Sequence, residues 1–435
     1  MNTTPTPRTL EAWLELLEAR HPKAIDLGLE RCRVVWQRMG SPRPAARIFV
    51  VAGTNGKGST VATLCGLLDG LGYRYGCYMT PHLHRYNERV QLLGQAVSDD
   101  LLLAAFEQVE AARQGTSLTY FEFGTLAAFQ ILAAAELDYA VLEIGLGGRL
   151  DAVNLVDADV AVITPIGLDH QEYLGNDLDS IGREKAGIIR PGRPVICGEE
   201  NPPRSILEAA AQQGAPLRRL GVDFRAREAG AGVRYDSNGL QLQLPRPVLF
   251  GPHQVDNLAT ALSAVLECIP SAARDLSALH RGLRSVRLPG RFERIDQAGA
   301  RGPAVWVDVG HNPLAARAVA AALAQLAAAG TVRRVRCVLG MLADKDAGAS
   351  VSELGGVISH WYCTSLPGER GQSGECLVQR IGEAAEPSRL SVFDSVERAL
   401  DAALADSSPG DGVLVFGSFL TAAAARRHYR ARRPG

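Results

Sequence analysis

Short apolar runs rich in β-branched residues alternate along this chain with longer stretches rich in alanine and leucine. In the first half of the chain the runs predict strands at 47–53, 75–79, 139–145, 160–166 and 193–198. The stretches between them predict helices that include 58–70, 100–112, 121–136 and 178–189. This alternation is typical of an α/β fold with mostly parallel strands.

A second series of apolar runs predicts strands at 304–310, 334–341, 360–364 and 412–418, each with a helical neighbour. The segment 287–303 between the two series contains glycines and prolines and little apolar periodicity. We therefore expect two domains, 1–296 and 297–435, with the boundary near residue 296. The stretch 222–250, also punctuated by proline and glycine, predicts a β-rich insertion in the first domain.

Composition narrows the possible functions. The 435 residues include 46 Lys or Arg and 47 Asp or Glu, for a net charge of −1, which argues against nucleic-acid binding through a basic face. No apolar run is long enough to span a membrane, and the N-terminus lacks the pattern of a signal peptide, so we expect a cytoplasmic protein. The eight scattered cysteines form no CxxC motif, which predicts buried free thiols and no structural zinc site.

Lysine is rare in this chain. Only four of the 46 basic residues are lysine, namely Lys23, Lys57, Lys185 and Lys345. Arginine serves wherever a plain cation is enough, so each lysine raises the question of what an ammonium does that a guanidinium cannot.

A glycine-rich loop connects the predicted strand 47–53 to the predicted helix 58–70. Backbone N–H groups and the helix N-terminus make such a turn suitable for a polyphosphate. Lys57 would reach the β- and γ-phosphates, and Ser59 or Thr60 could contact magnesium, although the spacing departs from the strict GxxxxGK[ST] motif. The loop, read as GTNGKGST, predicts an ATP site formed by Gly53, Thr54, Asn55, Gly56, Lys57, Gly58, Ser59 and Thr60.

Two later strands also end in polar residues. Glu143 closes the apolar run 139–145, and Asp169 and His170 follow the run 160–166. Side chains at the carboxyl ends of parallel strands face the ligand crevice of an open α/β sheet. A carboxylate there suits Mg²⁺, which makes Glu143 a candidate ligand. A single histidine after a strand is ordinarily a hydrogen-bonding residue.

The phosphate loop and several later segments resemble the folylpolyglutamate synthase and dihydrofolate synthase family, which is related to the Mur peptidoglycan ligases. The resemblance runs in consistent order from AIDLGLER at 24–31 to FGSF at 416–419. It implies an N-terminal P-loop ATPase-like domain with a mostly parallel sheet and a smaller C-terminal Rossmann-like α/β domain.

The resemblance also implies a metal site. It adds His170 as a magnesium ligand to the candidates Glu143 and Ser59. It also assigns a metal-binding hydroxyl to Thr80, where many family members carry serine. It further implies that Lys185 carries a carbamate formed with CO₂, that is, an N6-carboxylysine. From the residues alone, a surface lysine in a salt bridge beside Glu184 is the favoured interpretation of Lys185. Arginine does not lose its proton in proteins and could not form a carbamate.

Three segments correspond to the dihydropteroate pocket of the family. Aromatic side chains there would stack on a flat pterin ring, and a carboxylate such as Asp26 or Asp151 would accept from its N–H groups. Aromatics at a helix start are otherwise more often part of the core. The implied pocket consists of Ala24, Ile25, Asp26, Leu27, Thr119, Tyr120, Phe121, Glu122, Leu150, Asp151 and Ala152.

Later segments correspond to the remaining substrate sites. The resemblance places Asn257, Arg291 and Asp308 against ATP, with Arg291 stabilising the transferring phosphoryl group. It suggests His311 and Ser418 for the glutamate side. Lys345 lies in the family segment GMLADKD, where an ion pair with Asp344 or Asp346 is its only expected role.

Together with these features, the resemblance implies a bifunctional enzyme that uses ATP and Mg²⁺ to add L-glutamate to dihydropteroate and to reduced folates through an acyl phosphate. We expect a monomer whose partners are small molecules rather than nucleic acid or membrane. A Mur-type ligase is an alternative, but only 52 residues precede Gly53, too few for a uridine-nucleotide domain. A non-enzymatic P-loop protein is another, but it leaves Glu143, His170 and the second domain unexplained.

Overall fold

The computed structural model describes residues 7–21, 23, 25–296 and 302–432. The chain forms two compact units. The first takes in the chain up to Ile166 together with His170–Arg246 and Asp256–Val286; the second holds Gly167–Asp169, Pro247–Val255 and Arg287–Gly435. The boundary that we expected near residue 296 therefore falls inside the second unit.

An eight-stranded sheet forms the centre of the first unit, in the order β4-β3-β2-β5-β1-β6-β7-β8. In this order each pair from β2 onward is parallel, whereas β3 pairs antiparallel with both β2 and β4. The strands are β1 (Arg47–Ala52), β2 (Tyr75–Tyr78), β3 (Val90–Leu92), β4 (Gln95–Ala96), β5 (Tyr139–Glu143), β6 (Val160–Ile163), β7 (Val195–Cys197) and β8 (Leu217–Arg219).

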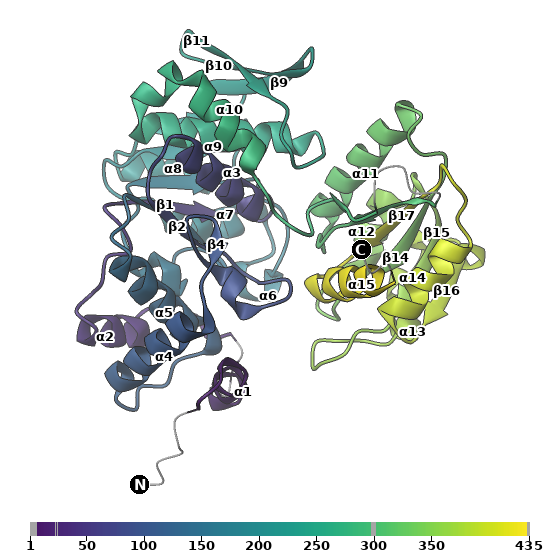
Figure 1. Ribbon diagram of the computed structural model, residues 1–435, viewed down its shortest axis with the longest axis horizontal. Helices are drawn as coiled ribbons and strands as arrows, with labels where there is room; N and C mark the ends of the chain where they lie inside the picture. The colour runs from purple at the N-terminus through teal and green to yellow at the C-terminus, as the bar shows by residue number, and fades with distance from the viewer. Residues whose placement is uncertain (1–6, 22, 24, 297–301, 433–435) are drawn as a thin grey trace. The chain divides into compact units, whose positions relative to one another are not determined.

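Helices cover both faces of this sheet, as Figure 1 shows for α2, α4 and α5 on one side and α3, α9 and α10 on the other. Alternate residues of β1 enter two separate cores: Ile48 and Val50 belong to one, Phe49 and Val51 to the other. A strand buried on both faces is apolar at every position, which explains the unbroken apolar runs of the sequence.

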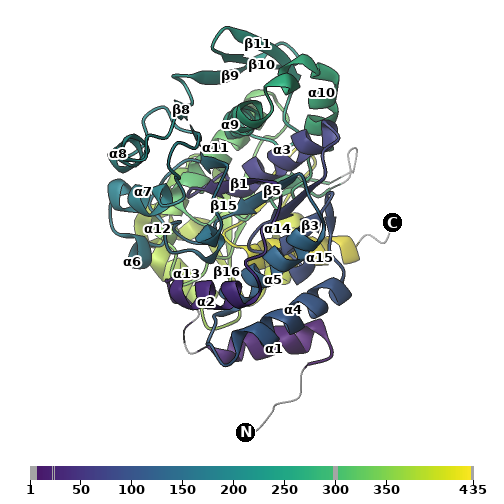
Figure 2. The same ribbon diagram turned by 90° about the vertical axis from the view of Figure 1, so that its left-hand side faces the viewer.

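The helices of the first unit vary widely in length. Among them α1 and α4 lie side by side (Figure 2). They are α1 (Leu10–Arg20), α2 (Glu30–Arg38), α3 (Lys57–Gly70), α4 (Asp99–Arg113), α5 (Tyr120–Ala134), α6 (Gln171–Leu174), α7 (Leu178–Ala186), α8 (Arg204–Gln212), α9 (His253–Cys268) and α10 (Leu276–Ser285). The predicted β-rich insertion is a three-stranded antiparallel sheet of β9 (Phe224–Ala229), β10 (Gly232–Ser237) and β11 (Leu240–Pro245).

The second unit has a six-stranded sheet in the order β12-β13-β17-β14-β15-β16. Only β12 is antiparallel to its neighbour. The strands are β12 (Glu293–Arg294), β13 (Ala304–Val307), β14 (Val335–Leu339), β15 (Ile358–Thr364), β16 (Leu390–Phe393) and β17 (Gly412–Phe416). The helices are α11 (Pro313–Ala328), α12 (Ala347–Leu354), α13 (Gly374–Ile381), α14 (Val396–Ala405) and α15 (Phe419–Ala431).

These two sheets confirm the predicted α/β fold with mostly parallel strands. All eight cysteines carry free thiols, and six of them are buried. Within the part of the chain that the structure describes, no helix combines the length and the apolar character needed to cross a membrane.

Candidate active site

Four neighbouring parallel strands of the first unit bring the predicted site residues to one edge of the sheet. These strands lie in the order β2, β5, β1 and β6. Thr80 follows β2, and Glu143 is the last residue of β5. The phosphate loop follows β1, and the segment that leads to His170 follows β6. Residues far apart in the sequence therefore meet at the edge where open α/β sheets bind ligands.

Two glycines give the phosphate loop its shape. Gly56 has φ +84° and precedes α3, in a backbone region that side chains rarely adopt, and a Cβ there would lie 2.7 Å from Oδ1 of Asn257. A Cβ on Gly53 would lie 1.8 Å from Oγ1 of Thr164. The loop thus packs directly on β6 and α9, and Asn257, predicted to contact the nucleotide, lies against it.

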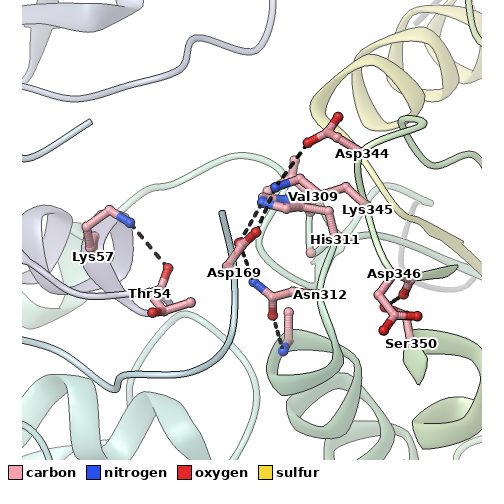
Figure 3. A network of polar contacts seen from close by, with 12 residues as sticks. Thr54, Lys57, Asp169, Val309, His311, Asn312, Asp344, Lys345, Asp346 and Ser350 are labelled. Carbon is pink, nitrogen blue, oxygen red and sulfur yellow. Dashed lines mark hydrogen bonds and ion pairs between the residues drawn. The ribbon is translucent and has the colours of Figure 1, made fainter. Parts of the chain in front are cut away.

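Lys57 opens α3 with its ammonium over the loop. Its Nζ donates to the carbonyl oxygens of Gly53 at 3.0 Å and Thr54 at 3.2 Å, the second of which is drawn in Figure 3. A phosphate oxygen would be a stronger, charged acceptor for the same group. Of the two candidate hydroxyls, that of Thr60 is fully buried. Ser59 keeps slight exposure, which favours it as the residue that a ligand can reach.

The candidate metal ligands lie close to one another. Glu143 is buried, and its Oε2 accepts the backbone N–H of Thr80 at 3.2 Å. Thr80 and His170 line the same pocket, and His170 adopts φ +51° just before α6. Among the described residues no three His, Cys, Asp or Glu side chains form a metal cluster. A carboxylate and hydroxyls beside a phosphate-binding loop nevertheless fit Mg²⁺, which usually takes one or two carboxylates and completes its shell with phosphate and water oxygens.

Lys185 is buried on α7, with only 3% of its surface exposed. Its neighbour Glu184 pairs instead with Arg149, at 2.8 Å. Gly148, in the turn after β5, packs on the backbone of both residues, since a Cβ there would approach the Glu184 carbonyl oxygen to 2.5 Å. The interpretation of Lys185 as a surface lysine is therefore wrong, because burial removes it from solvent.

A pocket of about 260 Å³ lies in the first unit, and it brings together ten of the eleven residues predicted to bind the pterin. The eleventh, Ala24, lies outside the described residues. The ten are Ile25, Asp26, Leu27, Thr119, Tyr120, Phe121, Glu122, Leu150, Asp151 and Ala152. The lining also includes Thr80 and His170, so the pocket reaches the candidate metal ligands.

Asp151 is the buried carboxyl group of this pocket. Its Oδ2 accepts the N–H of Leu146 at 2.8 Å and its Oδ1 accepts that of Val153 at 2.9 Å. Burial raises the pKa of Asp151 to about 7, although these backbone donors and Lys57 oppose the shift. The group therefore changes its charge near neutral pH.

Other predicted pocket residues have structural partners. Thr119 and Glu122 form a capping box at the start of α5, in which each side chain accepts the backbone N–H of the other. Arg31 pairs with Asp26 at 2.5 Å and with Glu122 at 2.8 Å. Arg31 thereby ties the loop at Asp26 to the start of α5, and residues of both segments line the pocket.

Sequence reasoning missed several residues of the lining. They are Pro81, Arg89, Gly145 and Leu146. An arginine in the motif YNERV gives no sign of burial, yet Arg89 is only 8% exposed.

In the second unit, polar residues follow the carboxyl ends of three neighbouring strands, β13, β17 and β14. Asp308, after β13, accepts the N–H groups of Phe292 and Gly310, each at 2.7 Å. Arg291 stacks on the ring of Phe419 with 5.1 Å between its guanidinium carbon and the ring centroid. Ser418, after β17, caps α15 through the N–H of Thr421 at 3.0 Å.

Asp169 lies beside three polar side chains of the second unit, those of Lys345, Asn312 and His311 (Figure 3). Its Oδ1 lies 2.8 Å from Nζ of Lys345, and its Oδ2 accepts from Asn312 at 3.0 Å. Nε2 of His311 is 3.7 Å from the same Oδ2, and burial, with the charge of Lys345, lowers the pKa of this histidine. Lys345 forms the expected ion pair with Asp344, at 3.7 Å. Its shorter partner is Asp169, which the sequence did not predict.

The comparisons agree with this geometry. Family models match the chain over residues 51–265 for the Mur ligase middle domain and over 290–419 for the Mur ligase glutamate ligase domain. The chain is 44% identical over 427 residues to the dihydrofolate synthase/folylpolyglutamate synthase of Escherichia coli K12, covering 98% of this chain and 97% of that protein. The Mycobacterium tuberculosis protein of the same name is 32% identical, with 97% and 95% covered.

Solved structures show the same likeness over the whole chain. One is E. coli FolC in complex with DHPP and ADP, with a TM-score of 0.90, 43% identity and coverage of 99% of this chain and 100% of that chain. Another is the bifunctional enzyme of Yersinia pestis complexed with AMPPNP and Mn ion, with a TM-score of 0.87, 42% identity and 99% of each chain covered. These findings confirm the resemblance seen in the sequence: the chain belongs to the dihydrofolate synthase/folylpolyglutamate synthase family of Mur-type ligases.

Proposed function

We propose that this protein is an ATP-dependent acid–amino-acid ligase with two related activities. It adds L-glutamate to 7,8-dihydropteroate, giving dihydrofolate, and to reduced folates, giving folylpolyglutamates, and it releases ADP and phosphate. The observation that carries the proposal is the pocket of the first unit. There the described residues expected to bind the pterin line one cavity together with Thr80 and His170.

The pocket suits a flat heterocycle with an N–H-rich edge. Tyr120 and Phe121 offer aromatic faces from the first turn of α5, and Asp151 offers a carboxyl group. Asp26 and Glu122 are already engaged by Arg31, so they hold the wall in place. We therefore assign Asp151, rather than Asp26 or Glu122, as the acceptor for the N–H groups of the pterin.

The first step is phosphoryl transfer from ATP to the substrate carboxylate. A carboxylate is a poor electrophile, and an oxygen of this group attacks the γ-phosphorus, giving an acyl phosphate and ADP. Lys57 neutralises charge on the phosphates in this step, and the loop N–H groups hold them. In the second unit, Arg291 and Asp308 would contact the nucleotide. His311 and Ser418 would bind glutamate.

The second step forms the amide. The neutral amine of glutamate attacks the acyl carbon and releases one proton, and the tetrahedral intermediate expels phosphate together with the former carboxylate oxygen. No covalent bond to the enzyme is needed. Ser59, Thr80, Glu143 and His170 would hold Mg²⁺, which when bound neutralises phosphate charge.

Lys185 is proposed to carry a carbamate. The neutral amine adds to CO₂ and releases one proton, which leaves an anion where a cation stood. The support is its burial beside the turn that follows Glu143, a place where an ammonium loses the hydration that stabilises its charge. The carbamate would help to position the metal.

A product assay tests the proposed function. The purified protein is incubated with ATP, Mg²⁺ and L-glutamate and with either dihydropteroate or tetrahydrofolate, and the products are identified by mass spectrometry. Each substrate should gain one glutamate residue, and ADP should form in equal amount; reactions without ATP are the control. ATP hydrolysis without a glutamate adduct from either substrate would refute the proposal. Light scattering in the same buffer tests the expected monomer.

A further inference from the structure

Arg89 is a buried cation on the wall of the pterin pocket. It ends the 3-10 helix η1 (Tyr86–Arg89) directly before β3, and it is 8% exposed. Its guanidinium carbon lies 4.9 Å from the ring centroid of Tyr86 and 5.2 Å from that of Tyr120. Its Nε donates to Nδ1 of His82 at 3.0 Å.

None of these neighbours supplies a negative charge. Burial, together with Arg89 itself, lowers the pKa of His82 to about 4, so the imidazole is neutral. Burial raises the pKa of Tyr86 and of Tyr120 above the usual value, so both phenols keep their protons. Among the described residues no carboxylate forms an ion pair with Arg89. The adjacent Glu88 accepts the backbone N–H groups of residues 83–85 instead.

A second arginine on the same wall shows the contrast. Arg31 pairs with two carboxylates, Asp26 at 2.5 Å and Glu122 at 2.8 Å. Arg89 is more deeply buried than Arg31, yet it pairs with neither of these carboxylates. A guanidinium does not lose its proton in a protein, so its burial without an anion is unfavourable until a ligand supplies one.

The proposed substrates differ in their negative charges. Dihydropteroate has one carboxylate, and that group reacts, so it must lie at the phosphate loop and the metal ligands. A folate has a second carboxylate, on the α-carbon of its glutamate, which does not react. Only this group needs a cation that neither Lys57 nor the metal provides.

We propose that Arg89 binds the α-carboxylate of folate substrates and so serves as a specificity residue for the folylpolyglutamate synthase activity. The inference rests on the proposed function. The guanidinium lies over the rings of Tyr86 and Tyr120, and its Nε donates to His82. A planar guanidinium can bind a carboxylate through two N–H donors at once, which a lysine could not match.

The test uses two substrates that differ by one group. Tetrahydrofolate is compared with tetrahydropteroyl-γ-aminobutyrate, which keeps the reacting γ-carboxylate and lacks only the α-carboxylate. The wild-type kcat/KM should be about 10- to 100-fold higher for tetrahydrofolate, as expected for a charge-assisted contact. In Arg89→Met this ratio should fall below about threefold, and the loss with tetrahydrofolate should exceed the loss with dihydropteroate at least about tenfold.

Arg85→Met is the matched control, since Arg85 lies one turn earlier, is exposed and pairs with Asp99 outside the pocket. It should keep the wild-type ratio. Equal wild-type kcat/KM values for the two folates would overturn the inference without any variant, even if Arg89→Met failed to fold. An equal loss with all three substrates in Arg89→Met would also overturn it, as a structural effect. A wild type that extends neither dihydropteroate nor tetrahydrofolate would instead refute the proposed function, and the inference with it.

Discussion

Replacing Asp151 with asparagine should change how the stability of the protein depends on pH. In the folded wild type, burial raises the pKa of this carboxyl group to about 7, whereas an unfolded aspartate titrates near a pKa of about 3.9. Between these values the folded state binds a proton that the unfolded state has released. The stability of the wild type therefore falls as pH rises through this window and levels off above it.

The size of the effect follows from the shift. Each pH unit well inside this window costs the wild type about 1.4 kcal/mol. Because half of the group is still protonated at a pH equal to its pKa of about 7, roughly 2 kcal/mol is lost from pH 5 to pH 7 and roughly 0.4 kcal/mol more by pH 8. Asparagine does not titrate. Its amide offers only one oxygen to the N–H groups of Leu146 and Val153, which costs about 1–3 kcal/mol at every pH.

The free energy of unfolding of the first unit can be measured by urea denaturation at pH 5, 6, 7 and 8 for both proteins. The difference between them should move in favour of Asp151→Asn by about 2 kcal/mol from pH 5 to pH 7 and level off by about pH 8. The infrared difference spectrum at pH 6 should contain the band of a protonated carboxyl group. Parallel pH profiles without that band would refute the reasoning. Dihydropteroate affinity should rise from pH 6 to pH 8 in the wild type alone, because the ionised carboxylate is the better acceptor.

Three further substitutions probe the site. Lys57→Ala should lower kcat at least about 100-fold with either substrate and leave thermal stability nearly unchanged, because it removes a charge from the phosphates; near-normal rates would contradict this. Lys185→Arg should impair catalysis although the charge is kept, and the carbamate signal that the wild type shows in ¹³C NMR with labelled bicarbonate should vanish; a fully active variant would remove the carbamate. Gly53→Ala should destabilise the first unit by about 1–3 kcal/mol, because the new Cβ meets Oγ1 of Thr164. Adding Thr164→Ala should restore part of that loss in a denaturation experiment, and no rescue would show that the contact is not the cause.

The nine strands predicted from the sequence were found because they are buried in the sheet interiors. A short run of β-branched and other apolar residues such as 48–52 favours a covered strand, and the glycines of the phosphate loop mark where it ends. The strands that the sequence did not reveal are β3, β4, β8, β12 and β16. They have two to four residues each and are partly or fully exposed, so their composition carries no clear pattern.

Contacts between residues far apart in the chain could not be predicted from the sequence either. Lys345 pairs with Asp169, 176 residues away, at a shorter distance than with its sequence neighbour Asp344, the partner that the sequence did predict. Burial of Lys185 and Arg89 depends on how helices and turns pack around them, which periodicity does not encode. For Lys57, Lys185 and Lys345, the rarity of lysine in the sequence was the signal that singled them out, although it said nothing of their partners.

Transfer of an oxygen isotope tests the central claim most directly. Dihydropteroate labelled with ¹⁸O in both carboxylate oxygens is converted with ATP and L-glutamate, and the phosphate and dihydrofolate are analysed by mass spectrometry. An acyl phosphate requires that one labelled oxygen leaves with phosphate and that the other stays in the new amide. Unlabelled phosphate from a reaction that still forms dihydrofolate would contradict the mechanism.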